Sequence, residues 1–211
     1  MTHTIRRVDR SGSVVVEFAL VTPILITLLL SIADLAPSLM VRFKLGIATQ
    51  AVADLATQFS AMTTADIANN LAIGPDTIAP FPSGNLVLRI TNVASDGNGN
   101  AFVYWSCGQG ALAPPLALSP VTSTPTGVIS LTKAGTNTSY VVVESQYSYS
   151  APAGFILPSP QIIQVKSYTL PRVSTYIGHT TGDPNYVPPT PTSTHSSSPV
   201  TLNGLTCNFA V

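Results

Sequence analysis

The sequence predicts an α+β protein with a long N-terminal transmembrane and amphipathic helix, a small antiparallel β-sheet domain, and a disordered C-terminal segment rich in Pro, Ser and Thr. Three observations support this prediction: an apolar run near the N-terminus, alternating strand patterns in the middle, and a C-terminal stretch without apolar periodicity. A length of 211 residues suits one domain of ordinary size in addition to the helix.

These patterns divide the chain into five segments. We expect a cytoplasmic basic leader at 1–12, a transmembrane helix at 13–41, a helical linker at 42–75, a β-rich domain outside the cytoplasm at 76–176, and a flexible tail at 177–211. Charged residues make up only 9% of the chain, and nine Lys and Arg balance nine Asp and Glu. This balance provides no basic surface, so binding of nucleic acid is not expected.

The N-terminal apolar run has the length of a transmembrane helix. No charged residue occurs from Phe18 to Ala33, and the run is 21 residues long when 13–17 are included. As a helix it would extend about 31 Å, which spans the hydrocarbon core of a bilayer. A signal peptide cleaved after Ala33 or Ala36 is a competing interpretation, although the apolar region of such a peptide is usually shorter.

The basic residues that flank the run predict its orientation. Arg6, Arg7 and Arg10 precede it, whereas only Arg42 and Lys44 follow it closely. The positive-inside rule therefore places the N-terminus in the cytoplasm and the rest of the chain outside it. We expect a single-pass protein of the inner cell membrane with a periplasmic C-terminal domain.

The run contains prolines and ends at a carboxylate. Pro23, and Pro37 just beyond the run, each remove one backbone hydrogen bond from a helix and tend to bend it. A hydroxyl of Thr22 or Thr27 could satisfy the carbonyl that Pro23 frees. Asp34 closes the run and is expected to be an interfacial carboxylate.

Glu17 lies four residues into the apolar run and needs an explanation. A carboxylate costs about 2–3 kcal/mol at the centre of a membrane helix and less near the interface, so snorkelling to the headgroups is one explanation. The spacing favours another, because Gly12 precedes Glu17 by five positions and Phe18 follows it directly. This order is typical of a prepilin-peptidase signal, in which the basic leader is removed after the glycine.

Cleavage between Gly12 and Ser13 would be physically reasonable. Glycine has no Cβ, so the backbone at the scissile bond is open to approach. The new α-amino group of Ser13 would lie one helical turn from Glu17. In an assembly we expect the pairing amine to come from a neighbouring subunit, with Glu17 and Phe18 in the packed region of the helix.

The stretch from Arg7 to Asp34 carries further residues of this pattern, namely the Val16-Glu17-Phe18-Ala19-Leu20-Val21 core and Pro23, six positions after the Glu. In these residues the chain resembles the TadE-like family of tight-adherence pilus proteins. The resemblance implies a minor pilin-like subunit, or pseudopilin, that a prepilin peptidase processes. It implies a role in assembly of a type IV pilus, in adhesion and in surface attachment.

The resemblance implies partners and no catalysis. The expected partners are the membrane, other pilin or pseudopilin subunits, the pilus assembly machinery and prepilin peptidase, with the protein in the inner membrane or the pilus. No cofactor is expected, and no catalytic motif occurs; His179 and His195 lie in the expected flexible tail. The alternative is an unprocessed, membrane-anchored extracytoplasmic protein with a binding or adhesion role.

Beyond the span, apolar residues recur at steps of three and four and predict a helix over about 44–62. The residues that recur are Ala48, Ala51, Val52, Leu55, Phe59 and Met62. Their face packs either on the domain's own core or on a partner helix. Thr64 followed by Asp66 predicts a second, short helix that ends at Gly74-Pro75.

The pattern then changes to the two-residue period of strands. We expect strands over 85–93, 101–107, 139–150 and 161–170. The turn Asp96-Gly97-Asn98-Gly99-Asn100 predicts a hairpin of the first two, and a loop rich in Pro and Gly joins the other two. The four strands form an antiparallel sheet with the amphipathic helix on one face.

Cys107 and Cys207 are the only cysteines of the chain. They form no CxxC motif and have no histidine close in sequence, so a metal site is not expected. In an oxidising compartment a disulfide between them would stabilise the fold by about 4 kcal/mol in the loop-entropy model. Two unrelated buried thiols are the alternative.

Overall fold

The computed structural model describes residues 11–95, 101–116, 119–121, 138–157, 159–180, 197–202 and 204–210. They form two compact units. The first contains the described residues up to Leu39 together with Ser150–Gln161, and the second contains Met40–Tyr149 and the residues from Ile162 onward. A long N-terminal helix followed by a six-stranded antiparallel sheet confirms the predicted α+β class.

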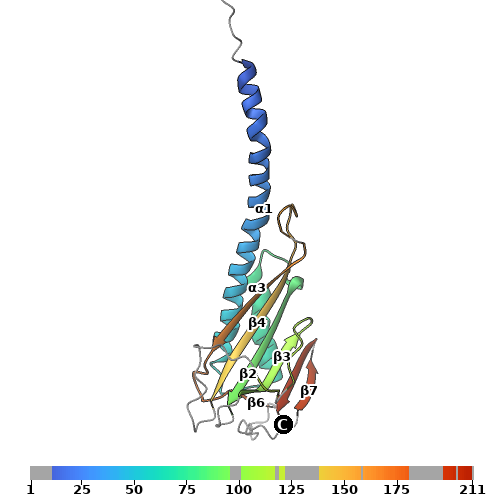
Figure 1. Cartoon of the computed structure of the whole chain (residues 1–211). Coiled ribbons are helices and arrows are strands. Elements are labelled where there is room, and N and C mark those ends of the chain that lie inside the picture. The colour runs from blue at the N-terminus through green and yellow to red at the C-terminus, as the bar shows by residue number, and fades with distance from the viewer. Residues whose placement is uncertain are drawn as a thin grey trace, which may run out of the picture. The chain divides into compact units, whose positions relative to one another are not determined.

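Helix α1 spans Ser11–Ala56, a length of 46 residues (Figure 1). The sequence predicts a transmembrane helix at 13–41 followed by a helical linker at 42–75. In the structure one helix runs from the first segment into the second and continues through both Pro23 and Pro37. A proline removes a single N–H donor and leaves most bonds of the neighbouring turns in place, so long apolar helices tolerate it.

The first part of α1 exposes apolar side chains on all its sides. Val14, Val15 and Val16 follow one another around the helix and are 60–68% exposed. Among the described residues, one helix is long and apolar enough to cross a membrane; it runs over Val14–Ala56, with a mean hydropathy of 2.4 and no burial in its most apolar window. A helix that is apolar all round suits a membrane and not a water-exposed surface.

The sheet of the second unit has the strand order β5-β4-β2-β3-β8-β7 (Figure 1). Its strands are β2 (Leu86–Ser95), β3 (Ala101–Gln109), β4 (Ser139–Tyr149), β5 (Gln161–Thr169), β7 (Ser197–Leu202) and β8 (Leu205–Ala210). The first four correspond to the four strands expected from the alternating pattern. β2 lies between β3 and β4 and pairs with both in antiparallel register, with Ile90 opposite Cys107 and Val143.

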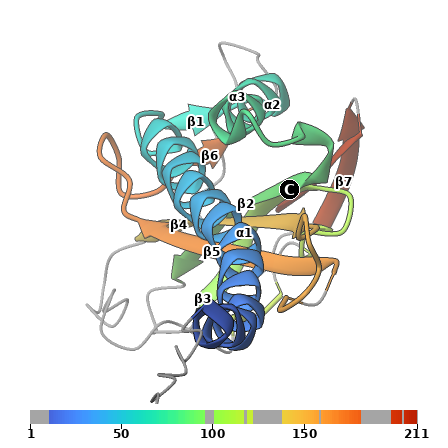
Figure 2. The same cartoon turned by 90° about the horizontal axis from the view of Figure 1, so that it is seen from above.

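The last turns of α1 cover one face of this sheet (Figure 2). The Oγ1 atom of Thr49 lies 2.6 Å from the Oγ atom of Ser145 on β4, and both residues are buried. Ala48 and Val52 are fully buried, as are Leu45 and Val41, about one and two turns before Ala48. For Ala48 and Val52, two residues of the predicted apolar stripe, packing on the domain's own core is confirmed.

Short elements complete the second unit. β1 (Ala61–Met62) pairs in parallel with β6 (Gly178–His179). α2 (Thr64–Leu71) is capped by Thr63. The Thr63 side chain accepts from the backbone N–H of Asp66, and the Asp66 carboxylate accepts from the backbone N–H of Thr63.

The expected end of α2 at Gly74-Pro75 differs from the structure, in which both residues lie in a further helix, α3 (Ile73–Ile78). Proline is tolerated there because N–H groups of the first helical turn have no partner within the helix. A short 3₁₀ helix, η1 (Ser83–Asn85), then leads into β2.

Lys44 belongs to the folded domain. Its Nζ atom donates to the carbonyl oxygens of Ala79, at 2.5 Å, and Thr77, at 3.5 Å, which lie at the C-terminal end of α3. A cation is stabilised at a helix C-terminus by the carbonyl dipoles that collect there. This basic residue, which follows the apolar run, therefore has a structural partner in the second unit.

The C-terminal region differs from the flexible tail expected at 177–211. Ile177 is fully buried, Gly178–His179 form β6, and β7 and β8 add two strands to the sheet. Residues 181–196, including His195, lie outside the described residues. A tail with little apolar periodicity is ordered here because β8 pairs with β3 and carries buried Leu205, Cys207 and Phe209.

Cys107 of β3 and Cys207 of β8 lie directly opposite each other and form a disulfide, with their Cα atoms 4.0 Å apart. Both residues are fully buried. The bond joins positions that are 100 residues apart in sequence. It therefore fixes the C-terminal strand pair to the centre of the sheet.

Candidate functional site

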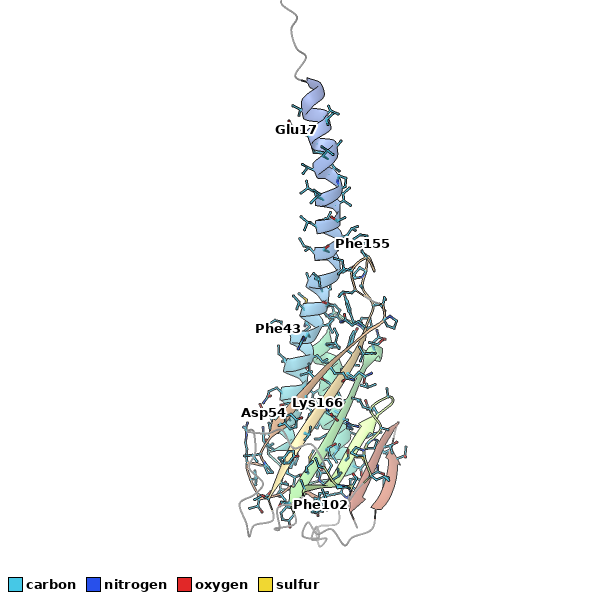
Figure 3. The ribbon with its side chains drawn as sticks, in the orientation of Figure 1. Glu17, Phe43, Asp54, Phe102, Phe155 and Lys166 are labelled. Carbon is cyan, nitrogen blue, oxygen red and sulfur yellow. A yellow bond between two sulfur atoms is a disulfide. The ribbon has the colours of Figure 1, made fainter. Side chains whose placement is uncertain are left out.

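The residues that the sequence analysis singled out for processing and assembly lie in the first two turns of α1. Gly12 and Ser13 are helical, and no atom lies within 4 Å of the position that a Cβ of Gly12 would take. Glu17 and Phe18 are exposed on the helix surface, and Figure 3 shows Glu17 near the start of α1. The basic leader before Ser11 lies outside the described residues.

Spacing along the helix brings Ser13 and Glu17 onto one face. They are four residues apart, which is about 6 Å along the axis and close to one full turn. Phe18 follows about 100° further around the helix. The carboxylate and the aromatic ring thus belong to adjoining strips of one apolar surface.

Hydroxyl groups in the span donate to the helix's own carbonyls. Thr22 donates to the oxygen of Phe18 at 2.7 Å, and Thr27 donates to that of Ile24 at 2.8 Å. The carbonyl that Pro23 frees is that of Ala19, four residues before it, so neither threonine makes the bond expected from the sequence. Both hydroxyls are nevertheless satisfied without water, as a lipid environment requires.

Asp34 makes the most specific polar contact of the first unit. Its carboxylate is fully buried against the segment between β4 and β5. Oδ1 accepts from the backbone N–H groups of Ala153 and Gly154, at 2.9 and 3.2 Å. Oδ2 accepts from those of Phe155 and Ile156, at 2.8 and 3.2 Å. One carboxylate thus receives four consecutive N–H groups.

Gly154 permits this arrangement because its φ is +61°, a left-handed conformation that glycine adopts at little cost. Successive N–H groups around such a residue form a concave anion-binding nest. The sequence analysis placed Asp34 at the interface but missed its partner. The one local signal that could have indicated this partner is the apolar Ala-Gly-Phe-Ile sequence between β4 and β5.

The second unit contains an ion network on the sheet face opposite α1. Arg89 of β2 donates through Nε to Glu144 of β4 at 2.5 Å, and Lys166 of β5 also pairs with Glu144. Burial raises the pKa of Glu144, but hydrogen bonds from Lys166 and Arg89 outweigh this effect and hold the pKa below its usual value. Glu144 is therefore an ionised, structural carboxylate.

An open hollow of about 280 Å³ lies over this network. Its lining includes Arg89, Glu144, Lys166, Tyr140, Tyr168 and Ser119. Both cations are engaged by Glu144, and Arg89 also donates to the carbonyl of Ala113 at 2.9 Å. The charged side chains that line the hollow therefore link β2, β4 and β5 to one another and to the backbone at Ala113.

His179 is a half-buried residue with a neutral ring. Its ring stacks on Phe209, with centroids 3.4 Å apart and planes at 22°. Burial lowers the pKa of His179 to about 4, so the ring is uncharged at neutral pH. In the described part of the chain, no three His, Cys, Asp or Glu side chains gather as candidate metal ligands.

The comparisons with known proteins single out the N-terminal region. Residues 12–64 match the model of a protein family described as TadE-like protein. The matched range begins at Gly12, contains Glu17 and Asp34, and ends at the start of α2. No curated protein and no solved structure matches the chain. The family resemblance found in the sequence is thereby confirmed.

Proposed function

We propose that this chain, whose N-terminal region is TadE-like, is a minor pilin-like subunit in the assembly of a tight-adherence type IV pilus. One observation carries the proposal: the first part of α1 is apolar on all sides and presents Glu17 on that surface, one turn after Ser13. Such a helix can insert into a bilayer, and after assembly it can pack in a bundle of similar helices.

Membrane insertion is the first step. The span from Ser13 to Ala33 crosses the bilayer with the arginine-rich leader in the cytoplasm. The second unit lies in the periplasm, where the Cys107–Cys207 disulfide is chemically stable. Lys44, one of the two basic residues after the span, contacts α3 of this domain, which fits a position outside the bilayer.

Processing is the second step. Prepilin peptidase hydrolyses the peptide bond between Gly12 and Ser13, which leaves a carboxylate on Gly12 and an ammonium group on Ser13. The open space around the Gly12 Cα favours access of the enzyme to this bond. The new charge appears at the cytoplasmic boundary of the span.

Assembly is the third step. The ammonium group of one subunit pairs with Glu17 of its neighbour as their helices pack together. In the apolar bundle this ion pair is desolvated, so loss of either partner costs about 3–5 kcal/mol. The contact would favour the packing of processed subunits over unprocessed ones. No catalytic chemistry and no cofactor are involved in this role.

N-terminal sequencing of the membrane-extracted protein tests the proposal. The expected first residue is Ser13, and a co-expressed peptidase should be required for it. A matched pair of variants sharpens the test, because Gly12 and Gly46 are both helical and both have open space at the Cβ position. Gly12→Val should block processing and Gly46→Val should not.

Each outcome separates the proposal from its alternative. An intact N-terminus in a strain that makes the peptidase and assembles pili would overturn the pilin-like role. It would leave the chain as an unprocessed, membrane-anchored binding or adhesion protein. A mature product of unchanged mass from Gly12→Val would contradict the assigned cleavage site.

A further inference from the structure

The contact between Asp34 and the β4–β5 connection has the chemistry of a site shielded from water. Four backbone N–H groups of an irregular segment, Ala153–Ile156, all donate to one carboxylate on the membrane helix. In water such a contact adds only a modest net stabilisation, because water competes for the same N–H groups and for the carboxylate. In lipid an unsatisfied N–H group or an unpaired carboxylate is costly. The contact provides hydrogen-bond partners for the four N–H groups and for the carboxylate.

The segment that Asp34 holds is itself apolar. Phe155 is 58% exposed and Ile156 is 48% exposed, although their backbone N–H groups are bound. No charged residue occurs in the sequence between Glu144 and Lys166. Figure 3 shows Phe155 at the tip of this connection, beside α1. The tip thus offers apolar side chains and no free charge.

The position of Asp34 sets the depth of this tip. A span that begins at Ser13 reaches the opposite boundary of a hydrocarbon core of about 30 Å after about 20 residues, which is at Ala33 and Asp34. The exposed apolar side chains of α1 continue past this level through Leu35 and Leu39. Phe155 and Ile156, fixed to Asp34, therefore adjoin the membrane-facing surface of the helix.

We propose that the Ala153–Ile156 segment of the β4–β5 connection is a second membrane contact, in which Phe155 and Ile156 insert into the interfacial region of the periplasmic leaflet. Asp34 is the positioning residue, since it binds the N–H groups that would otherwise meet lipid. Aromatic side chains favour this region of the bilayer. The inference rests on the proposed membrane insertion of α1 and adds a lipid partner for a segment outside the family match.

Depth-dependent fluorescence quenching tests this contact in the full-length protein. Both cysteines are in the disulfide, so an introduced cysteine is the one free thiol for an environment-sensitive dye. The protein is placed in vesicles of phosphatidylethanolamine and phosphatidylglycerol. These vesicles carry a nitroxide either near the headgroup or near the end of the acyl chain. Labels are compared at Phe155→Cys, Leu25→Cys in the span, and Val173→Cys, an exposed apolar position of the second unit.

The expected result is quenching of the residue 155 label, and more strongly by the shallow nitroxide than by the deep one. The Leu25 label should show the opposite order, and the Val173 label should be quenched less than the residue 155 label. Quenching at Leu25 without quenching at 155 would overturn the second contact and leave insertion of α1 intact. Absence of quenching at Leu25 would contradict both the membrane insertion of α1 and the second contact.

The role of Asp34 has its own test. Asp34→Asn keeps the side-chain size but replaces one acceptor oxygen by an N–H₂ group that faces two N–H donors. Quenching of the residue 155 label should fall in this variant, whereas quenching at Leu25 should persist. Asp76→Asn, an exposed carboxylate in α3, is the control and should change neither. Equal quenching at 155 with and without Asp34 would contradict the positioning role. Protection of this label by self-association without lipid would assign the tip to a second copy.

Discussion

The two carboxylates of the apolar helix have opposite environments. Glu17, near the start of α1, is exposed on an apolar surface, whereas Asp34, further along, is fully buried and accepts four N–H groups of the same chain. The comparison shows that this chain can enclose a carboxylate at the end of its apolar run. The exposure of Glu17 is therefore a property of the N-terminal end of the helix, and it suits contacts with other molecules.

The largest expected effect is that of Glu17→Gln, which removes the charge and keeps the size. We expect normal membrane insertion, but association with other pilin subunits weaker by about two to three orders of magnitude, because a desolvated ion pair is lost. Counting pili and measuring co-purification of pilin subunits checks this. Ser31→Ala, a polar change within the same span, is the control. Normal piliation of Glu17→Gln would break the comparison.

Asp34→Ala should change a contact within the chain itself. Removal of the acceptor leaves the four N–H groups of Ala153–Ile156 without the carboxylate, so their amide hydrogen exchange should speed up by about tenfold or more. Mass spectrometry of the vesicle-bound protein measures this. Asp76→Ala serves as the matched control. Unchanged exchange in this segment would show that the carboxylate does not hold it.

Gly154→Ala tests the same contact from the other side. No atom lies within 4 Å of the new Cβ, so the effect comes from the φ of +61° alone and should be about 1–2 kcal/mol of local stability. Exchange at Phe155 and Ile156 should rise accordingly. Gly84→Ala, at a position with open space and an ordinary φ, should leave exchange unchanged. An equal rise in both variants would rule out the backbone explanation.

The smallest expected effect concerns a third carboxylate, Glu144, which is paired with Arg89 and Lys166. Lys166 is 52% exposed, so Lys166→Met should cost only about 0.2–1 kcal/mol of unfolding free energy. Because the folded-state pKa of Glu144 is lowered from 4.5, its contribution is present above that pH and is lost as the pH falls through the lower folded value. Urea unfolding at several pH values should show a smaller acid-induced loss in Lys166→Met than in the parent chain. An identical loss would exclude Glu144 as its source.

Local patterns predicted most of the elements. The alternation of Tyr147 and Tyr149 with polar neighbours predicted β4, and the Asp96–Asn100 turn predicted the β2–β3 hairpin. The two-residue period and turn chemistry are local properties. Gly12, Glu17 and Phe18 were likewise found from spacing alone. All three residues are exposed in the structure, and their processing and assembly roles are proposals.

The long-range contacts were not visible in the sequence. Asp34 meets residues about 120 positions later, and no local period relates them. β7 and β8 have a weak apolar pattern. β8 gains its order from pairing with β3 and from the disulfide, and β7 gains its order from pairing with β8. Elements whose stability comes from distant partners look like loops when only the chain around them is considered.

The disulfide between β3 and β8 also bears on the order in which the sheet can form. Cys207 follows Cys107 by 100 positions, so the sheet cannot reach its final strand order until all the residues between them have been synthesised. A chain synthesised only as far as β5 would have a complete α1 and a sheet without β7 and β8. Oxidation of the two thiols would then fix the last strand pair after the other strands have formed.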